Sequence, residues 1–181
     1  VPTVWLALLQ YLDAEQKSFS TLERVVIGGS SCPRAVIEAF QDNYGVQVIH
    51  AWGMTELSPL GTICTFKPEV LALDPKARVD VQETTGHPPF GVDLKVVGED
   101  GSDLPWDGQT PGMLLARGDA VVQRYLKTES DCVDADRWFD TGDMATMDAN
   151  GYMRITDRTK DVIKSGGEWI SSIDLENVAV A

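Results

Sequence analysis

The segment Asp140–Ser171 constrains the fold of this chain more than any other. Thr141-Gly142-Asp143 precedes an apolar run, Asn150-Gly151 interrupts it, and a second apolar run leads to Arg158. An Asn-Gly pair between two such runs predicts a β-hairpin. Because a basic and glycine-rich stretch follows the hairpin, we expect a junction between two domains here, with the second domain barely begun at the end of the chain.

The expected hairpin brings an acid and a base together. With a two-residue turn at Asn150-Gly151, Asp143 faces Arg158 and Met147 faces Arg154. A four-residue loop would slip the register by one residue on each strand, and both strand ends would still meet. A carboxylate accepts hydrogen bonds from two vicinal hydroxyls, and a guanidinium donates to phosphate or ribose oxygens. The alternative is an ordinary surface ion pair that stabilises little.

The N-terminal region has α/β character. Apolar residues at helical spacing predict a helix over Trp5–Leu12, and a β-branched run predicts a strand at Arg24–Ile27. A second helix is expected to open at Pro33, with Ser31 or a neighbour as its cap, and to end at Gly45.

A further strand is expected at Val46–Ala51, and it leads into the loop Trp52-Gly53-Met54-Thr55-Glu56. Ligands of open α/β sheets bind where loops leave the carboxyl ends of strands. A threonine hydroxyl can bind a phosphate oxygen, and a glutamate can hold Mg²⁺. The alternative is a tight turn with a buried aromatic ring and a solvated glutamate. Gly28-Gly29 and Gly166-Gly167 fit either a ligand approached by backbone or plain turns, and neither pair forms a Walker or Rossmann fingerprint.

From about Thr62 onward, proline and glycine become frequent and short strands alternate with turns. We expect a mostly antiparallel β subdomain, and the chain divides into residues 1–62, 63–156 and 157–181. The expected strands are Asp93–Val97, Met113–Arg117, Met144–Met147 and Tyr152–Ile155.

Composition narrows the choice of partners. A net charge of -13 argues against nucleic acid or an anionic membrane as partner, although a local nucleotide site remains compatible with it. The three cysteines show no metal or disulfide spacing, so we expect a cytoplasmic protein. No apolar run reaches the roughly 18–20 residues of a membrane span. His50 is expected in the core, with no catalytic role.

The order and spacing of four segments resemble the adenylate-forming superfamily of acyl-CoA synthetases, adenylation domains and luciferases. These segments are Gly28–Pro33, HAWGMTELSPLGT from His50, GMLLARGDAVVQRY from Gly112, and Trp138–Ser171. Trp52 in place of the commoner tyrosine, with the run from Glu168 to Ser171, resembles the medium-chain fatty acyl and methylmercaptopropionyl-CoA ligase branch. The resemblance implies an α/β fold: the C-terminal part of a large adenylation domain, running into a small C-terminal α+β domain.

The resemblance also implies a role for each candidate residue. Trp52 would stack on the adenine of ATP or AMP, Thr55 would bind the α-phosphate, and Glu56 would hold Mg²⁺. Asp143 would accept both ribose hydroxyls, with Arg158 nearby. The other residues implied at the adenine and acyl pocket are Gly28, Gly29, Ser30, Gly53 and Met54.

Lys160 lies where the family has a hinge between two half-reactions. The residues implied to face coenzyme A or to flank the hinge are Lys164, Gly166, Gly167, Glu168 and Trp169. The reaction implied is carboxylate plus ATP to acyl-adenylate and pyrophosphate, then attack by the coenzyme A thiol with release of AMP.

Two family features are missing: an upstream Ser/Thr/Gly-rich phosphate loop and a downstream lysine. We therefore expect a fragment of a fatty acyl-CoA ligase with little or no activity by itself. The alternatives are an acyl-AMP ligase, a peptide-synthetase adenylation domain, and a non-catalytic nucleotide-binding module. The oligomeric state cannot be predicted from the sequence.

Overall fold

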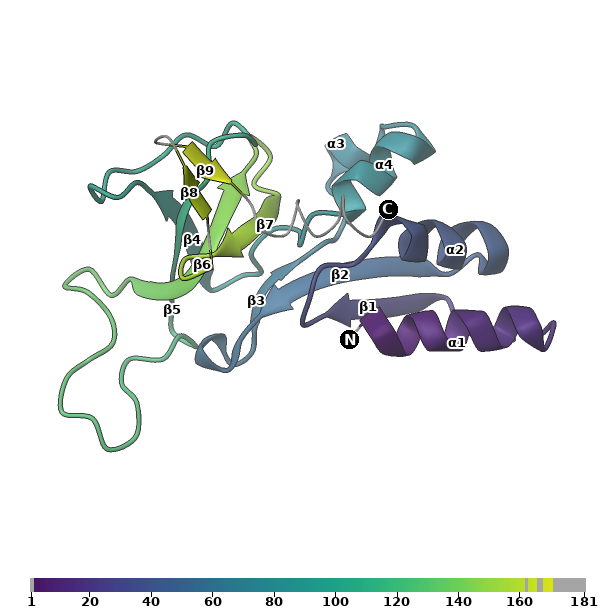
Figure 1. The fold of residues 1–181 in the computed structure, drawn as a ribbon, viewed down its shortest axis with the longest axis horizontal. Coiled ribbons are helices and arrows are strands. Elements are labelled where there is room, and N and C mark those ends of the chain that lie inside the picture. The colour runs from purple at the N-terminus through teal and green to yellow at the C-terminus, as the bar shows by residue number, and fades with distance from the viewer. Residues whose placement is uncertain (1, 162, 166–167, 171–181) are drawn as a thin grey trace.

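The computed structural model describes residues 2–161, 163–165 and 168–170. The first of its sheets has three strands. β1 (Arg24–Gly28) pairs in parallel with β2 (Gln47–Gly53), and β3 (Leu60–Ile63) pairs antiparallel on the other side of β2. The helices α1 (Pro2–Ala14) and α2 (Arg34–Tyr44) pack beside it (Figure 1). The parallel pair joined through a helix confirms the predicted α/β class.

The first core lies between these helices and the sheet. Phe40 of α2 is fully buried, and the rings of Trp5 and Phe19 pack against it at centroid distances of 5.6 and 6.2 Å. Gly45 ends α2 in the left-handed region (φ 65°), as predicted. The expected serine cap is wrong: Pro33 occupies the N-cap position and no side chain caps the helix.

β2 is longer than its sequence indicates. Trp52 and Gly53, expected in a loop, are its last two residues because they pair with Thr62 and Leu60 of β3. The chain then forms the 3₁₀ turn η1 (Thr55–Leu57). Only the later part of the predicted loop is therefore a loop.

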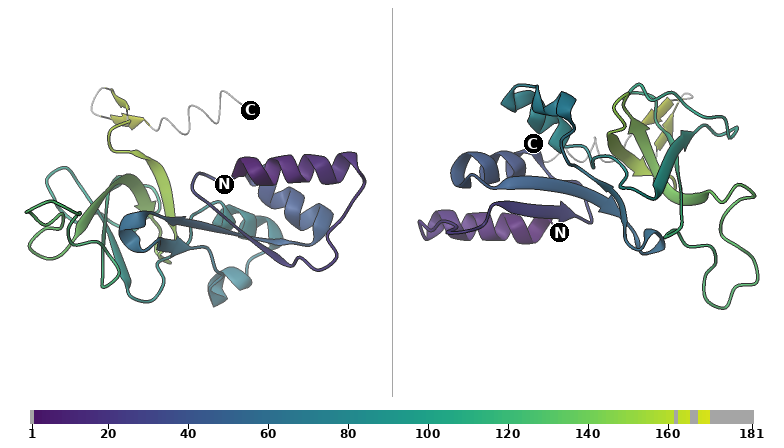
Figure 2. Two further views of the ribbon diagram at one scale, coloured as in Figure 1. Left: turned by 90° about the horizontal axis from the view of Figure 1, so that it is seen from below. Right: turned by 180° about the vertical axis from the view of Figure 1, so that it is seen from behind.

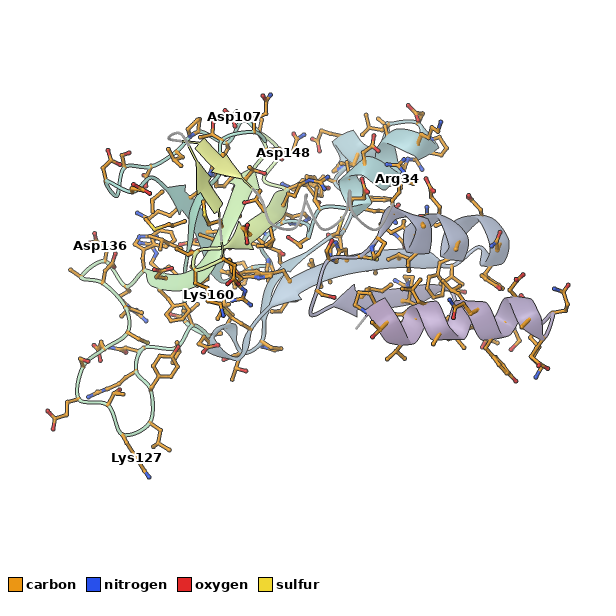
Figure 3. The ribbon with its side chains drawn as sticks, in the orientation of Figure 1. Arg34, Asp107, Lys127, Asp136, Asp148 and Lys160 are labelled. Atoms are coloured by element: carbon orange, nitrogen blue, oxygen red, sulfur yellow. The ribbon has the colours of Figure 1, made fainter. Side chains whose placement is uncertain are left out.

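Two helices lie where strands and turns were expected. They are α3 (Pro68–Leu71) and α4 (Pro75–Gln82). Asp74 caps α4 by accepting a hydrogen bond from the Ala77 N–H, and an Asp-Pro start of this kind was visible in the sequence. Arg34 of α2 extends toward α4 and binds the Asp80 carboxylate at 2.5 Å (Figure 3). α4 thus packs with α2 beside the first sheet. The predicted boundary at residue 62 stays a prediction.

The second sheet is fully antiparallel, as expected. Its strands, in spatial order, are β4 (Val92–Val97), β5 (Gly112–Gly118), β6 (Phe139–Met147) and β7 (Met153–Arg158). All four predicted strands are present, and each is longer than predicted. Residues 119–138, between β5 and β6, project from the sheet as a long loop, with Lys127 near its tip (Figures 1 and 3).

The β6–β7 hairpin confirms one predicted pair and corrects another. Asp143 pairs with Arg158, as predicted, but Met147 pairs with Met153 instead of Arg154. The loop holds three residues between Asp148 and Tyr152, with Gly151 at φ 80°, so the register near the turn is offset by one. A bulge between Met144 and Ala145 restores the predicted register at the far end.

The short segment Gly86-His87 joins the two sheets through backbone contacts. Ile63 of β3 bridges His87, and the Met153 N–H of β7 donates to the Gly86 carbonyl at 2.7 Å. Gly86 has φ 88°, and a Cβ there would overlap the backbone of Ile63 and Cys64. These contacts therefore hold β3, at the edge of one sheet, close to β7, at the edge of the other. Figure 2 gives two further views of the fold.

The chain continues past β7 into β8 (Ile163–Ser165) and β9 (Glu168–Ile170), which pair antiparallel. Within the described residues, no helix combines the length and apolarity needed to cross a bilayer.

Candidate functional site

Three of the predicted residues form one hydrogen-bonded group at the junction of the sheets. The indole N–H of Trp52, in β2, donates to Asp143 Oδ2 at 2.9 Å, and Arg158 Nε lies 2.9 Å from Asp143 Oδ1. The side chain of Asp143 is 3% exposed, and that of Arg158 is 56% exposed. The site is thus a buried carboxylate that binds two donors: the half-buried indole of Trp52 and the largely exposed guanidinium of Arg158.

Local structure in β6 fixes this carboxylate. Gly142 has φ 70°, a conformation that side chains rarely adopt, and the Thr141 hydroxyl donates to the Leu114 carbonyl of β5 at 2.8 Å. The Asp143 N–H in turn donates to the Thr141 hydroxyl oxygen at 3.2 Å. Thr141-Gly142 therefore turns Asp143 toward β2 and the first sheet.

Burial raises the pKa of Asp143, and the Arg158 charge and the Trp52 hydrogen bond oppose that rise. A carboxylate in such a place favours ligands that donate hydrogen bonds. Each of its oxygens has two lone pairs, so the two donors present leave acceptor positions for a diol.

The Trp52 ring rests on a glycine. A Cβ at Gly61 of β3 would overlap the six-membered ring of the indole. Trp52 is half-buried and packs against the second sheet's core with Met54. A flat apolar ring held on one side and partly open on the other can stack with a heterocyclic base.

Glu56, the predicted metal ligand, lies in η1 and is held from the long loop of residues 119–138. The Tyr125 hydroxyl donates to Glu56 Oε1 at 3.0 Å, and the Val122 N–H donates to the Glu56 carbonyl at 2.7 Å. Partial burial, and then the bond to Glu56, raise the pKa of Tyr125, so its hydroxyl stays a donor at neutral pH.

Among the contacts of the described residues, the second carboxylate oxygen of Glu56 has no partner. Such a carboxylate fits Mg²⁺, which is commonly held by one or two carboxylates together with substrate phosphates. Thr55, at the start of η1, is exposed, as a phosphate-binding hydroxyl needs to be. Among the described residues, no group of three potential ligands forms a metal site by itself. Glu56 could therefore hold the ion only together with a bound phosphate.

The predicted glycines have structural explanations as well. A Cβ at Gly28 would lie 2.7 Å from the Ala51 carbonyl oxygen, so strand packing alone requires glycine there. Gly29 has φ 86°, and Ser30 beside it is exposed. Gly53 faces the Pro59 carbonyl with no room for a side chain.

His50 is a core residue, as expected. It is 2% exposed, and its Nδ1 lies 3.2 Å from the Glu83 carbonyl oxygen. Burial lowers its pKa.

The remaining predicted residues lie beyond the group. Lys160 is exposed two residues after β7 ends (Figure 3). The backbone of Lys164 lies in β8 and that of Glu168 and Trp169 in β9, whereas Gly166 and Gly167 fall outside the described residues. Their roles stay predictions.

Sequence reasoning gave no role to Tyr125, Gly61 or Thr141, which hold Glu56, Trp52 and Asp143. Tyr125 ends one of the four segments used for the resemblance, and that position was the only signal available. A contact between residues 69 apart has no local pattern.

Comparisons with known proteins identify relatives that match the whole chain. A 3-methylmercaptopropionyl-CoA ligase of Ruegeria pomeroyi is 50% identical over all 181 residues, and a medium-chain-fatty-acid–CoA ligase of Ectopseudomonas oleovorans is 48% identical over the same length. The match covers 34% and 33% of those proteins, so the chain spans about one third of the curated relatives it matches.

A solved structure of the anthranilate CoA ligase AuaEII in complex with anthranoyl-AMP superposes with a TM-score of 0.78 at 27% identity. The match covers 99% of this chain and 33% of that one. The family model described as AMP-binding enzyme matches residues 1–126, which is more than half of the chain. The chain therefore belongs to the AMP-binding enzyme family.

Proposed function

We propose that this chain supplies nucleotide- and acyl-binding elements of an ATP-dependent fatty acyl-CoA ligase. The observation that carries the proposal is the group of Trp52, Asp143 and Arg158, in which a stacking ring and a diol-accepting carboxylate are fixed side by side. The similarity to two CoA ligases at 48–50% identity supports the same reaction class. The substrates are a fatty acid, ATP and coenzyme A.

In the first step a carboxylate oxygen of the acid forms a bond to the α-phosphorus of ATP, and the bond to the bridging oxygen breaks, releasing pyrophosphate. The chain's part is positioning: Asp143 accepts the ribose hydroxyls, Trp52 stacks on the base, and Thr55 donates to an α-phosphate oxygen. When bound at Glu56, Mg²⁺ offsets the phosphate charge that repels the incoming carboxylate.

In the second step the sulfur of coenzyme A attacks the acyl carbonyl carbon. AMP leaves as the carbon–oxygen bond breaks, and the thiol proton passes to solvent. We propose Lys160, which is exposed just after β7, as the hinge between the two steps. Lys164, Gly166, Gly167, Glu168 and Trp169 are proposed to face coenzyme A.

The test is acid-dependent ATP–pyrophosphate exchange by the protein expressed from its full reading frame, across acids from acetate to palmitate, with coenzyme A added afterwards. We expect exchange that peaks at medium chain length and thioester once coenzyme A is present. Exchange without thioester would support an acyl-AMP ligase or an adenylation domain instead. No exchange with any acid would reject both and leave a non-catalytic nucleotide-binding module.

The polypeptide of 181 residues makes a second test. We expect it to form no AMP, because no Ser/Thr/Gly-rich phosphate loop occurs in its sequence. Acid-dependent AMP release by this purified polypeptide would contradict that expectation.

A further inference from the structure

The Trp52 ring has a second property besides its flat face. Its N–H points at Asp143 Oδ2, across the junction between β2 and β6, at 2.9 Å. Phenylalanine has no donor, and the hydroxyl of tyrosine lies at another position of the ring. Stacking alone would not require an indole here.

The two donors on Asp143 differ in freedom. Arg158 is a long side chain that is 56% exposed, so it can turn into solvent at little cost. Trp52 is half-buried, has only two side-chain torsions, and lies against Gly61, where even a Cβ would not fit. The indole therefore holds its place while the guanidinium can leave.

This difference matters because Asp143 is nearly covered. Its side chain is 3% exposed, so a ribose diol reaches the carboxylate only if one covering group yields. Arg158 is the group that can yield. A carboxylate freed on one oxygen could then rotate, unless the other oxygen stays bound.

We propose that Trp52 is a positioning residue for Asp143: its indole N–H fixes the carboxylate so that the freed oxygen meets the ribose hydroxyls. This inference rests on the proposed nucleotide binding. It assigns the indole nitrogen a role separate from stacking, and it predicts that loss of this nitrogen weakens recognition of the ribose more than recognition of the base.

The test compares AMP with 2′,3′-dideoxy-AMP by calorimetry, using the protein from its full reading frame. We expect the wild type to prefer AMP by about 10-fold or more, the scale of hydrogen bonds to a charged group. In Trp52→Phe, which keeps an aromatic face, that preference should fall to about 3-fold or less. A change in stacking weakens both ligands equally and leaves the preference unchanged.

Trp106→Phe is the matched control, because Trp106 is 42% exposed and lies beside Gly151, at the turn end of the hairpin. It should keep the wild-type preference. An unchanged preference in a folded Trp52 variant overturns the inference, whereas a wild type that binds neither ligand overturns the proposed function itself.

Should Trp52→Phe not fold, indole ¹⁵N–¹H spectra of the wild type decide. One indole N–H resonance must shift in Asp143→Asn and must stay protected from exchange when AMP is bound. If no indole resonance responds to Asp143→Asn, the inference is wrong.

Discussion

Asp143 and Arg158 are directly paired residues of β6 and β7, and their side chains meet at 2.9 Å. Asp93 and Arg117 form a matching pair on β4 and β5 at 3.0 Å. The two pairs differ in burial: the Asp143 side chain is 3% exposed, and that of Asp93 is 64% exposed. The chain thus contains its own control for the effect of burial.

Arg158→Ala should destabilise the fold at neutral pH. Burial raises the folded-state pKa of Asp143 above its unfolded value. The free energy of unfolding therefore falls as pH rises from the unfolded pKa through the folded pKa, because the buried carboxyl must ionise there. Removing Arg158 raises the folded-state pKa of Asp143 further, so stability is lost up to a higher pH. We expect a loss of about 1–2 kcal/mol at neutral pH and little loss near pH 4, measured by urea unfolding. Arg117→Ala should change little at either pH, and equal losses in both variants would contradict the argument.

Gly61→Ala should displace the Trp52 ring. The added Cβ overlaps the indole, so we expect a loss of about 1–3 kcal/mol in stability together with loss of AMP binding. Gly45→Ala is the comparison, because nothing lies within 4 Å of its added Cβ and only the left-handed backbone is strained. It should lose stability and keep AMP binding. Retained affinity in Gly61→Ala would show that the ring's position is not needed.

Tyr125→Phe should raise the Mg²⁺ requirement. Loss of the hydroxyl frees the Glu56 carboxylate to rotate, and we expect the Mg²⁺ concentration for half-maximal pyrophosphate exchange to rise about 3- to 10-fold. Tyr11→Phe, at a half-exposed position of α1, is the control. An unchanged Mg²⁺ dependence would place the contact outside the metal site.

His50→Gln should weaken the loss of stability that the protein shows as pH falls below neutrality. Burial lowers the folded-state pKa of His50, so stability is full above the unfolded pKa near 6.5 and is lost as pH falls toward the folded pKa. The wild type should therefore lose stability as pH falls below about 6.5, and His50→Gln should lose less there. Thermal unfolding of both proteins across this pH range is the measurement. If His50→Gln loses stability with falling pH as steeply as the wild type, other groups cause that loss.

Local patterns predicted the strands and the Asp143–Arg158 contact. The contact was predicted from an assumed two-residue turn, whereas the turn has three residues and a bulge at Met144/Ala145 compensates. A bulge has no sequence pattern of its own, because it depends on how the partner strand packs. The helices α3 and α4 were missed because proline was interpreted as a sign of turns.

Contacts between the sheets were beyond reach from sequence alone. Trp52 and Asp143 are 91 residues apart, and no period or spacing links them. The resemblance placed both around one nucleotide, yet gave no reason to expect a hydrogen bond between them. Tyr125 and Glu56 present the same difficulty.

Gly86 has a consequence for how the proposed enzyme would move. Its backbone lies so close to Ile63 and Cys64 that a Cβ would not fit, and the Trp52–Asp143 hydrogen bond also joins the two sheets. We therefore expect the ring and the carboxylate to stay aligned during turnover, with only side chains such as that of Arg158 moving between them. Rearrangement between half-reactions should then start after Arg158. Spin labels placed in β2 and β6 should report one fixed separation throughout turnover.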